Sequence, residues 1–323
     1  MLYGVTMGDA SGIGPEVLLK AFRDGELKYP FVVFGDLAVL RYYDERLKYG
    51  VPMRAIARPE QYKPGSVNVI GHGAVEVGDI TPGKLNTKSG AAAREYVIRA
   101  TRAVLGGEIA AIVTLPMNKE ATRLSDSSFT GHTELIGSLC GVKDVTIMLA
   151  SEQLIVTHVS THVSLKTAIE LAKRERIQTI IRLTCDAMRK LKTEPRVAVA
   201  GLNPHAGENG LFGDEEIREI RPAVEWAQSQ GMPVEGPLPP DAVFYLAVRK
   251  KKFDAIVCMY HDQGHVPLKL LDFEGGVNVT LGLPIIRTSV DHGTAFDIAG
   301  RGIASTASFV RALAYAARLA GEV

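Results

Sequence analysis

The stretch from Ala255 to His265 decides the fold most clearly, and it reads Ala-Ile-Val-Cys-Met-Tyr-His-Asp-Gln-Gly-His. It opens with an unbroken apolar run, which is typical of a strand that is buried on both faces. The polar residues that follow at once mark the point where this strand ends. In α/β proteins ligands bind beyond the carboxyl ends of the strands, so this stretch predicts both an architecture and a place for chemistry.

The same pattern recurs along the chain. Further apolar runs predict strands at 31–34, 110–114, 146–150, 154–159 and 196–202. Between and after them lie segments typical of helices, at 89–105, 164–191, 213–230 and 307–319. Ser164 is the expected N-cap of the second helix. The alternation predicts an α/β fold whose mostly parallel sheet is covered on both faces. One lobe is expected from the N-terminal portion and the extreme C-terminus, and another from the middle-to-late strands.

Charge and composition exclude several classes of protein. The 323 residues include 37 Lys and Arg against 36 Asp and Glu, so the net charge is +1. Proteins that bind nucleic acids or membrane surfaces normally carry a strong basic excess. No stretch reaches the length of a membrane helix, and the first residues do not look like a secretory signal. Three scattered cysteines fit a reducing compartment, so we expect a cytoplasmic location.

Three histidines follow three separate predicted strands. His162, His205 and His261 each lie just beyond a strand's carboxyl end, and these ends share one edge of a parallel sheet. Three imidazoles with open coordination positions suit a catalytic divalent metal such as Zn²⁺, Mn²⁺ or Co²⁺, and Mg²⁺ if substrate oxygens complete the shell. Asp262 and Glu208 could orient these ligands.

Spacing alone does not settle the ligand set. His158 lies four residues before His162, and His265 lies four residues after His261, so both remain alternatives. His72 lies in a turn flanked by glycines, and we assign it no role.

Other polar residues suit an anionic ligand. Lys119 follows the strand at 110–114, and a hydroxyl lies beside an imidazole at His132 and Thr133, a pair that suits phosphate or carboxylate. Arg287 can bind such a group in bidentate fashion, and Lys269 can add a point charge.

Two loops and one acid complete the set of candidates. The loop from Gly8 to Glu16 lacks the third glycine of a dinucleotide fingerprint, so a tight structural turn is the favoured interpretation. The polar loop at 291–300 could host an adenosine moiety. Asp241 follows two prolines and is interpreted first as a helix N-cap.

Taken together, these segments resemble the 4-hydroxythreonine-4-phosphate dehydrogenase (PdxA) family. The resemblance rests on ordered motifs that span nearly the whole chain: Pro-Met-Asn-Lys at 116–119, Gly-His-Thr-Glu at 131–134, Leu-Asn-Pro-His-Ala-Gly-Glu at 202–208, Tyr-His-Asp-Gln-Gly at 260–264 and the segment at 278–295. The glycine loop departs slightly, because Ala10-Ser11 stands where the family commonly has Pro-Ala.

This resemblance implies a two-lobed, three-layer fold like that of isocitrate and isopropylmalate dehydrogenases, with the active site in the cleft between lobes. It also implies a homodimer with shared active sites, and a mode of NAD binding unlike that of Rossmann proteins. By motif, the metal ligands are His162, His205 and His261, which in the family come from both subunits.

The same motifs imply the other site residues. The substrate-binding residues are His132, Thr133, Lys269, Asn278 and Arg287. The loop that meets the adenosine end of NAD contains His292, Gly293, Thr294, Ala295 and Asp297. Asp241, Asp262 and Lys119 are the candidates for the general base.

The implied reaction is oxidation of a 3-hydroxyl in a 4-phosphorylated four-carbon acid, followed by decarboxylation. One branch of the family acts on 4-phosphohydroxy-L-threonine, on the way to pyridoxine. The other acts on 4-phospho-D-threonate or 4-phospho-D-erythronate in sugar-acid breakdown, and several local strings here, such as 208–216 and 264–269, favour it. A metal-dependent phosphohydrolase and a non-catalytic sugar-phosphate-binding protein are remote alternatives.

Overall fold

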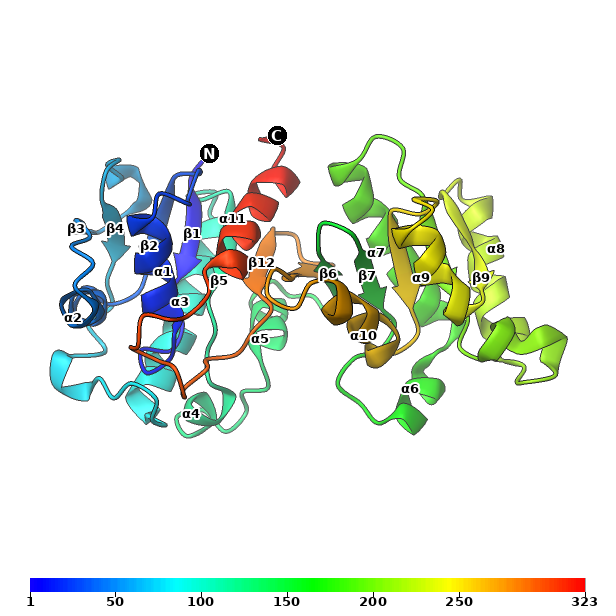
Figure 1. The fold of residues 1–323 in the computed structure, drawn as a ribbon, viewed down its shortest axis with the longest axis horizontal. Coiled ribbons are helices and arrows are strands. Elements are labelled where there is room, and N and C mark those ends of the chain that lie inside the picture. The colour runs from blue at the N-terminus through cyan, green and yellow to red at the C-terminus, as the bar shows by residue number, and fades with distance from the viewer. Residues whose placement is uncertain (323) are drawn as a thin grey trace. The chain divides into compact units, whose positions relative to one another are not determined.

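The computed structural model describes residues 1–322, which divide into two compact units. Unit 1 comprises residues 1–143 together with the described residues from Leu283 onward, and unit 2 comprises Asp144–Gly282. Figure 1 follows the chain through both units by colour. No helix within residues 1–322 is long and apolar enough to span a bilayer.

Unit 1 contains a parallel set of strands in the order β3-β4-β2-β1-β5-β12. Its strands are β1 (Tyr3–Thr6), β2 (Phe31–Phe34), β3 (Met53–Ile56), β4 (Val67–Ile70), β5 (Ala111–Thr114) and β12 (Arg287–Val290). Its helices are α1 (Gly14–Arg23), α2 (Leu37–Leu47), α3 (Thr87–Leu105), α4 (Lys119–Arg123), α5 (His132–Leu139) and α11 (Ala307–Leu319), with short turns η1 (Pro59–Gln61) and η2 (Val77–Asp79). Every residue of β1, β2, β4, β5 and β12 is buried, so both faces of these strands are covered.

Unit 2 has strands in the order β11-β6-β7-β10-β8-β9. They are β6 (Thr146–Ala150), β7 (Ile155–His158), β8 (Val197–Ala200), β9 (Val234–Leu238), β10 (Ala255–Cys258) and β11 (Val277–Leu281). Its helices are α6 (Leu165–Leu171), α7 (Arg174–Leu191), α8 (Arg221–Ser229), α9 (Pro240–Val248) and α10 (His261–Leu271), with the 3-10 helix η3 (Pro204–Gly210) and the π-helix η4 (Glu216–Ile220). β6 runs antiparallel to both β7 and β11. The turn that joins β6 to β7 is too short for the crossover that parallel strands need.

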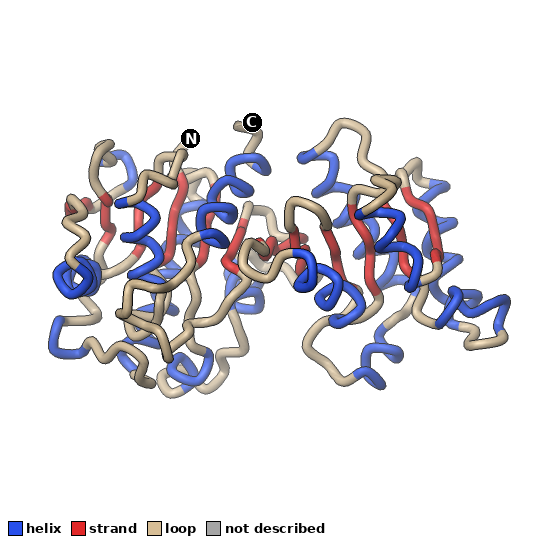
Figure 2. Tube along the Cα trace, in the orientation of Figure 1, coloured by secondary structure: helices blue, strands red, loops and turns tan. Residues whose placement is uncertain are grey.

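The core of unit 2 shows its three layers directly. Val197 and Val199 of β8 pack in a cluster with α7 and α8, whereas Ala198 and Ala200 pack in a second cluster with α9 and α10. Alternate residues of a strand point to opposite faces, so helices cover both sides of this sheet. Figure 2 shows strands lying between helices in each unit. The predicted α/β class is therefore confirmed.

The helix predicted at 164–191 is two helices, α6 and α7. Ser164 is the N-cap as predicted, because its Oγ accepts the backbone N–H of Thr167 at 3.2 Å. The chain then breaks, since a tertiary contact gives α7 its own start: the Glu219 carboxylate accepts the N–H of Arg174 at 3.0 Å. A cap from a distant residue is not visible in local sequence.

The capping role first assigned to Asp241 is wrong. α9 begins at Pro240 and its N-cap is Pro239, so Asp241 lies inside the first turn, exposed. Proline has no N–H and a fixed φ, which suits it to the first helical position.

Candidate functional site

A buried cation lies between the ends of two strands of unit 1. Arg287, the first residue of β12, is only 3% exposed. Its Nη2 and Nε donate to Oγ1 of Thr114, the last residue of β5, at 2.7 and 3.2 Å. Burial lowers the pKa of Arg287 to about 10, with Glu134 opposing the shift. A guanidinium that is removed from water can bind an anion strongly through paired hydrogen bonds.

His132 and Lys119 lie close to this cation. His132 begins α5, where free backbone N–H groups favour a negative ligand. Burial holds the pKa of His132 well below 6.5, and the charges of Arg287 and Lys119 lower it further, so the imidazole is neutral. Its Nε2 is buried and has no hydrogen-bond partner among residues 1–322. The structure thus brings together His132, Lys119 and Arg287, and Thr133 follows in the same helical turn.

Four histidines of unit 2 form a cluster of rings. The rings of His162 and His261 lie 5.6 Å apart, and those of His261 and His265 are stacked at 3.5 Å. Nε2 of His158 lies 3.2 Å from Nδ1 of His265. Nδ1 of His261 bonds Oδ1 of Asp262 at 2.7 Å.

Burial distinguishes His158 from the other three histidines, because His162 is exposed and His261 and His265 are partly exposed. His158 is fully buried, and burial, followed by the influence of His265, lowers its pKa to about 3. It is therefore a neutral ring turned toward His265. His162 and His261 instead line a pocket of about 550 Å³ together with Tyr260 and Asp262. Of the two alternatives that spacing left open, His158 is closed to a ligand by burial, whereas His265 is partly exposed and stacked on His261.

His205 does not join this cluster in one copy of the chain. It is exposed in η3, and its ring lies 6.1 Å from that of Phe212. Across residues 1–322, no group of three His, Cys, Asp or Glu side chains is placed to hold a metal ion. The imidazoles of His162 and His261 are of a donor type that fits two positions of a metal centre.

The backbone around His205 is unusual. Residues His205 to Asn209 all have positive φ, between 43° and 80°, and only Gly207 among them is a glycine. L residues avoid this left-handed conformation, which costs roughly 1–2 kcal/mol per residue. Such strain persists only where surrounding contacts impose it, and it is common at functional sites.

The remaining predicted substrate residues belong to unit 2. Lys269 lies on α10 with Nζ 5.2 Å from the centre of the Phe273 ring. Asn278 lies on β11, and its Oδ1 is buried without a hydrogen-bond partner in the described part of the chain. An unpartnered buried amide oxygen is costly, so a ligand that donates to it would be stabilising.

The predicted cofactor loop is held by the glycine loop and the helix after it. The N–H of Ile13 donates to the carbonyl of Thr294 at 3.0 Å. The buried carboxylate of Glu16 accepts the N–H groups of Gly300 and Ala304, both at 2.9 Å. Nε2 of His292 is buried with no hydrogen-bond partner within residues 1–322.

The glycine loop itself is a tight turn. Gly8 has φ +76°, and a Cβ there would lie 2.4 Å from the carbonyl oxygen of Pro116. The N–H of Ser11 donates to Oδ1 of Asp9 at 2.8 Å, and burial raises the pKa of Asp9 to about 6. The structural interpretation of this loop therefore agrees with its geometry.

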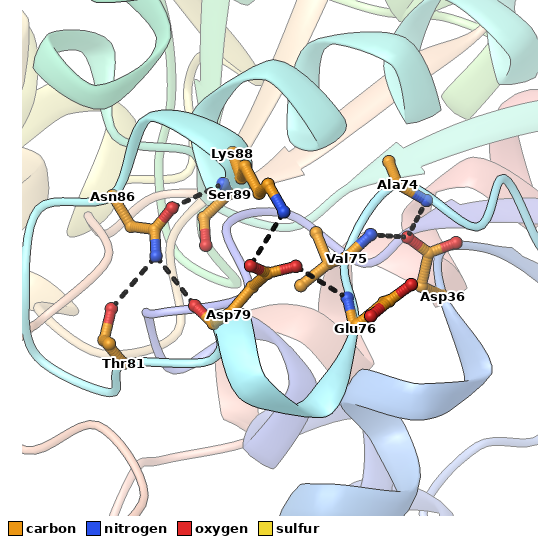
Figure 3. A network of polar contacts seen from close by, with 9 residues as sticks. All are labelled: Asp36, Ala74, Val75, Glu76, Asp79, Thr81, Asn86, Lys88 and Ser89. Carbon is orange, nitrogen blue, oxygen red and sulfur yellow. Dashed lines mark hydrogen bonds and ion pairs between the residues drawn. The ribbon is translucent and has the colours of Figure 1, made fainter.

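Sequence reasoning missed three buried carboxylates that organise loops: Glu16, Asp36 and Glu216. Asp36 accepts the backbone N–H groups of residues 72–75 and the hydroxyl of Tyr96, all at 2.7–2.9 Å. Figure 3 shows part of this arrangement beside the contacts of Asp79 and Asn86. No local pattern marks these acids, because their partners are distant in sequence.

Comparison with known proteins gives matches over nearly the full length. Residues 26–316 match the family described as pyridoxal phosphate biosynthetic protein PdxA. D-threonate 4-phosphate dehydrogenase of Salmonella typhimurium is 44% identical over 321 residues, which are 98% of each chain. 4-Hydroxythreonine-4-phosphate dehydrogenase of Beijerinckia indica is 44% identical over 318 residues, 98% of this chain and 94% of its own.

Solved structures agree with these matches. 4-Hydroxythreonine-4-phosphate dehydrogenase from Klebsiella pneumoniae is 42% identical, with a TM-score of 0.88 over 99% of both chains. Isocitrate dehydrogenase from Methylococcus capsulatus is 14% identical, with a TM-score of 0.50 over 99% of this chain and 86% of its own. The second likeness concerns the fold alone, and it confirms the predicted similarity to isocitrate dehydrogenase.

Proposed function

This chain belongs to the PdxA family of dehydrogenases, and from that premise we propose that it oxidises the 3-hydroxyl of a 4-phosphorylated four-carbon acid and that the product loses carbon dioxide. NAD⁺ is the proposed hydride acceptor. The favoured substrates are 4-phospho-D-threonate and 4-phospho-D-erythronate. The Salmonella relative named for D-threonate 4-phosphate supports this choice. The Beijerinckia relative supports 4-phosphohydroxy-L-threonine as the second candidate.

The observation that carries this proposal is the buried cation of unit 1. Arg287 is desolvated, and His132 at the start of α5 and Lys119 at the start of α4 lie beside it. A phosphorylated acid presents a phosphate and a carboxylate, and either can accept paired N–H bonds from a guanidinium. The neutral His132 can donate or accept a hydrogen bond without adding charge. Thr133, Lys269 and Asn278 are the proposed contacts for the remaining polar groups of the substrate.

His162 and His261 are the proposed ligands of a divalent cation, with Zn²⁺, Mn²⁺, Co²⁺ and Mg²⁺ as candidates. Asp262 bonds Nδ1 of His261, a residue of the pocket wall, which leaves Nε2 of that ring as the nitrogen proposed to bind the cation. When bound, such a cation supplies positive charge that stabilises an ionised substrate hydroxyl.

A second copy of the chain is the proposed source of the third ligand, His205. α10 carries large apolar side chains in solvent: Val266 is 61% exposed, Leu270 86%, and Phe273, just beyond the helix, 76%. A run of exposed apolar residues beside His261 is typical of a protein–protein interface. We therefore propose a homodimer in which one protomer supplies His205 to the pocket of its partner.

The loop from His292 to Asp297 is the proposed site of the adenosine end of NAD⁺, and it includes Gly293, Thr294 and Ala295. The unpartnered Nε2 of His292 fits this role, and the space beside Gly293 is open. NAD⁺ supplies hydride acceptance when bound. The proton of the substrate hydroxyl is assigned to one of three candidate bases, Asp262, Asp241 or Lys119.

The test is formation of NADH by metal-reconstituted protein. 4-Phospho-D-threonate, 4-phospho-D-erythronate and 4-phosphohydroxy-L-threonine are compared side by side, with chelator-treated protein as the control. A higher kcat/KM for either sugar acid is the expected result. A higher kcat/KM for the hydroxythreonine would instead establish the second candidate. Phosphate release without NADH would replace both with a phosphohydrolase.

A further inference from the structure

The left-handed run from His205 to Asn209 needs something to hold it in place. A run of this kind is unfavourable for L residues, so it does not persist on local preference alone. The run lies within the 3-10 helix η3, and three backbone hydrogen bonds close its two ends: Ala206 N–H to the carbonyl of Asn203 at 3.1 Å, Leu211 N–H to that of Glu208 at 3.2 Å, and Phe212 N–H to that of Gly207 at 3.2 Å. Because the left-handed conformation is unfavourable for L residues even with such bonds, contacts from outside the loop are needed as a further constraint.

Glu216 supplies that constraint. Its side chain is 1% exposed, and Oε1 accepts the backbone N–H groups of Leu202 and Asn203, both at 2.7 Å. Its Oε2 accepts the side-chain amide of Asn203 at 2.9 Å. These donors lie directly before the left-handed run, so one carboxylate fixes the point at which the loop leaves β8.

The loop also packs directly on this carboxylate. A Cβ at Gly207 would lie 2.8 Å from Oε2 of Glu216 and 2.8 Å from the carbonyl oxygen of Gly213. Only glycine fits between these atoms. The neighbouring Glu215 accepts the side-chain amide of Asn203 at 2.7 Å but no backbone N–H within residues 1–322, so we expect it to contribute much less.

We infer that Glu216 is a positioning residue: it holds the left-handed turn that presents the imidazole of His205 to the metal site. The inference rests on the proposed function, because that proposal gives His205 its role. Glu216 itself is buried and is not proposed to contact substrate or metal. Its effect passes through the backbone of Leu202 and Asn203.

The experiment compares Glu216→Ala with Glu215→Ala, which is the matched control. Cobalt-reconstituted protein reports the metal site through its visible absorption, and titration gives the Co²⁺ affinity. For Glu216→Ala we expect a 10- to 100-fold loss of Co²⁺ affinity and an altered spectrum, as for other residues that orient metal ligands. We expect kcat to fall while KM for NAD⁺ is unchanged. Glu215→Ala is expected to stay within about twofold of the unaltered protein on each readout.

Two further variants keep the test decisive if Glu216→Ala folds poorly. Glu216→Gln keeps the shape and loses the charge, so an intermediate loss of Co²⁺ affinity is expected. Adding Ala206→Gly to Glu216→Gln is expected to restore part of that affinity, because glycine takes positive φ without steric cost.

Two results would overturn the inference: an unchanged cobalt spectrum and affinity in Glu216→Gln, or equal losses in the Glu215 and Glu216 variants. Failure of the proposed function looks different. In that case the unaltered protein forms no NADH with any of the three substrates, while the cobalt titrations still report on Glu216.

Discussion

Two loops of this molecule are held by the same device, a buried glutamate that accepts two backbone N–H groups. In unit 1, Glu16 holds Gly300 and Ala304 at the end of the proposed cofactor loop. In unit 2, Glu216 holds Leu202 and Asn203 at the start of the loop that carries His205.

The two loops differ in backbone strain. In the unit 1 loop, positive φ occurs at Gly300 and Gly302, where glycine makes it inexpensive, and otherwise at Ala295. The His205 loop takes positive φ at four residues with side chains as well as at Gly207. The comparison teaches that a buried carboxylate can fix the position of a relaxed loop or can hold a loop in a strained backbone conformation. Removing Glu16 should therefore let its loop shift, whereas removing Glu216 should let the backbone of the His205 loop change conformation.

Substituting the histidine of each loop should change activity more than any other substitution considered, and the two loops should respond differently. His205→Ala should lower kcat roughly a thousandfold and reduce bound metal, because it removes a proposed metal ligand. His292→Ala should mainly raise KM for NAD⁺, because it alters only the proposed cofactor loop. Steady-state kinetics and metal analysis on the folded variants check both expectations. Normal metal content and kcat in His205→Ala would remove that residue from the ligand set.

The next largest effect is expected at Asp36, whose carboxylate accepts five hydrogen bonds, more than Glu16 or Glu216. Figure 3 shows two of the donors, Ala74 and Val75. In Asp36→Asn an amide group would face N–H donors, so the free energy of unfolding should fall by about 3–5 kcal/mol. Denaturant titration measures this loss. A loss below about 1 kcal/mol would show that a buried carboxylate is not what orders residues 72–75.

The pH dependence of stability follows from the same carboxylate. Burial alone would raise the pKa of Asp36, but hydrogen bonds from residues 72, 75 and 73 and from Tyr96 outweigh it and hold the pKa below 3.8. The ionised group therefore stabilises the fold above its unfolded pKa, and this contribution is lost as the pH falls through the folded pKa. Asp36→Asn should show a shallower loss of stability on acidification below about pH 4.

A smaller effect is expected for Glu16→Gln, because Glu16 has two backbone donors and the loop it holds is largely relaxed. The expected loss of stability is about 2 kcal/mol, with a raised KM for NAD⁺ and little change in kcat. Calorimetry and kinetics separate these effects. If kcat fell as much as in Glu216→Ala while KM for NAD⁺ did not change, the distinction drawn between the two loops would be wrong.

The smallest expected effect is an increase in stability. Ala206→Gly should stabilise the unaltered protein by about 0.5–1 kcal/mol, since relief of left-handed strain exceeds the added entropy of the unfolded chain. The same change at Ala168, in a helix with ordinary φ, is the control and should destabilise by a similar amount. Destabilisation by Ala206→Gly would mean that residue 206 carries no appreciable strain.

Much of the architecture was predictable because buried strands have a strong local signal. The apolar runs at 31–34 and 255–259 correspond to β2 and β10, and the helix predicted at 307–319 is α11. The break between α6 and α7 was not predictable, because Glu219, which caps α7, is distant in sequence. Asp241 was misjudged because two prolines shift the helix start by their own geometry.

The site was predictable in its residue types and less so in its supports. Strand ends indicated His162 and His261, and the structure places their rings 5.6 Å apart. Sequence spacing could not rank His158 against His162, since the difference between them is burial. Nor could it find Glu16 or Glu216, whose roles depend on backbone atoms of distant loops. The left-handed run at His205 has one local hint, the glycines at 207 and 210, but it contains too many other residues to predict.

The measurement that tests the central claim most directly is complementation between two inactive variants, His205→Ala and His261→Ala. If each site takes His205 from one protomer and His261 from its partner, a mixed dimer has one site with both residues intact. Co-expression with random pairing should then restore about a quarter of the unaltered NADH-forming activity. Mixed dimers that are confirmed by native mass spectrometry yet remain as inactive as each variant alone would contradict the account.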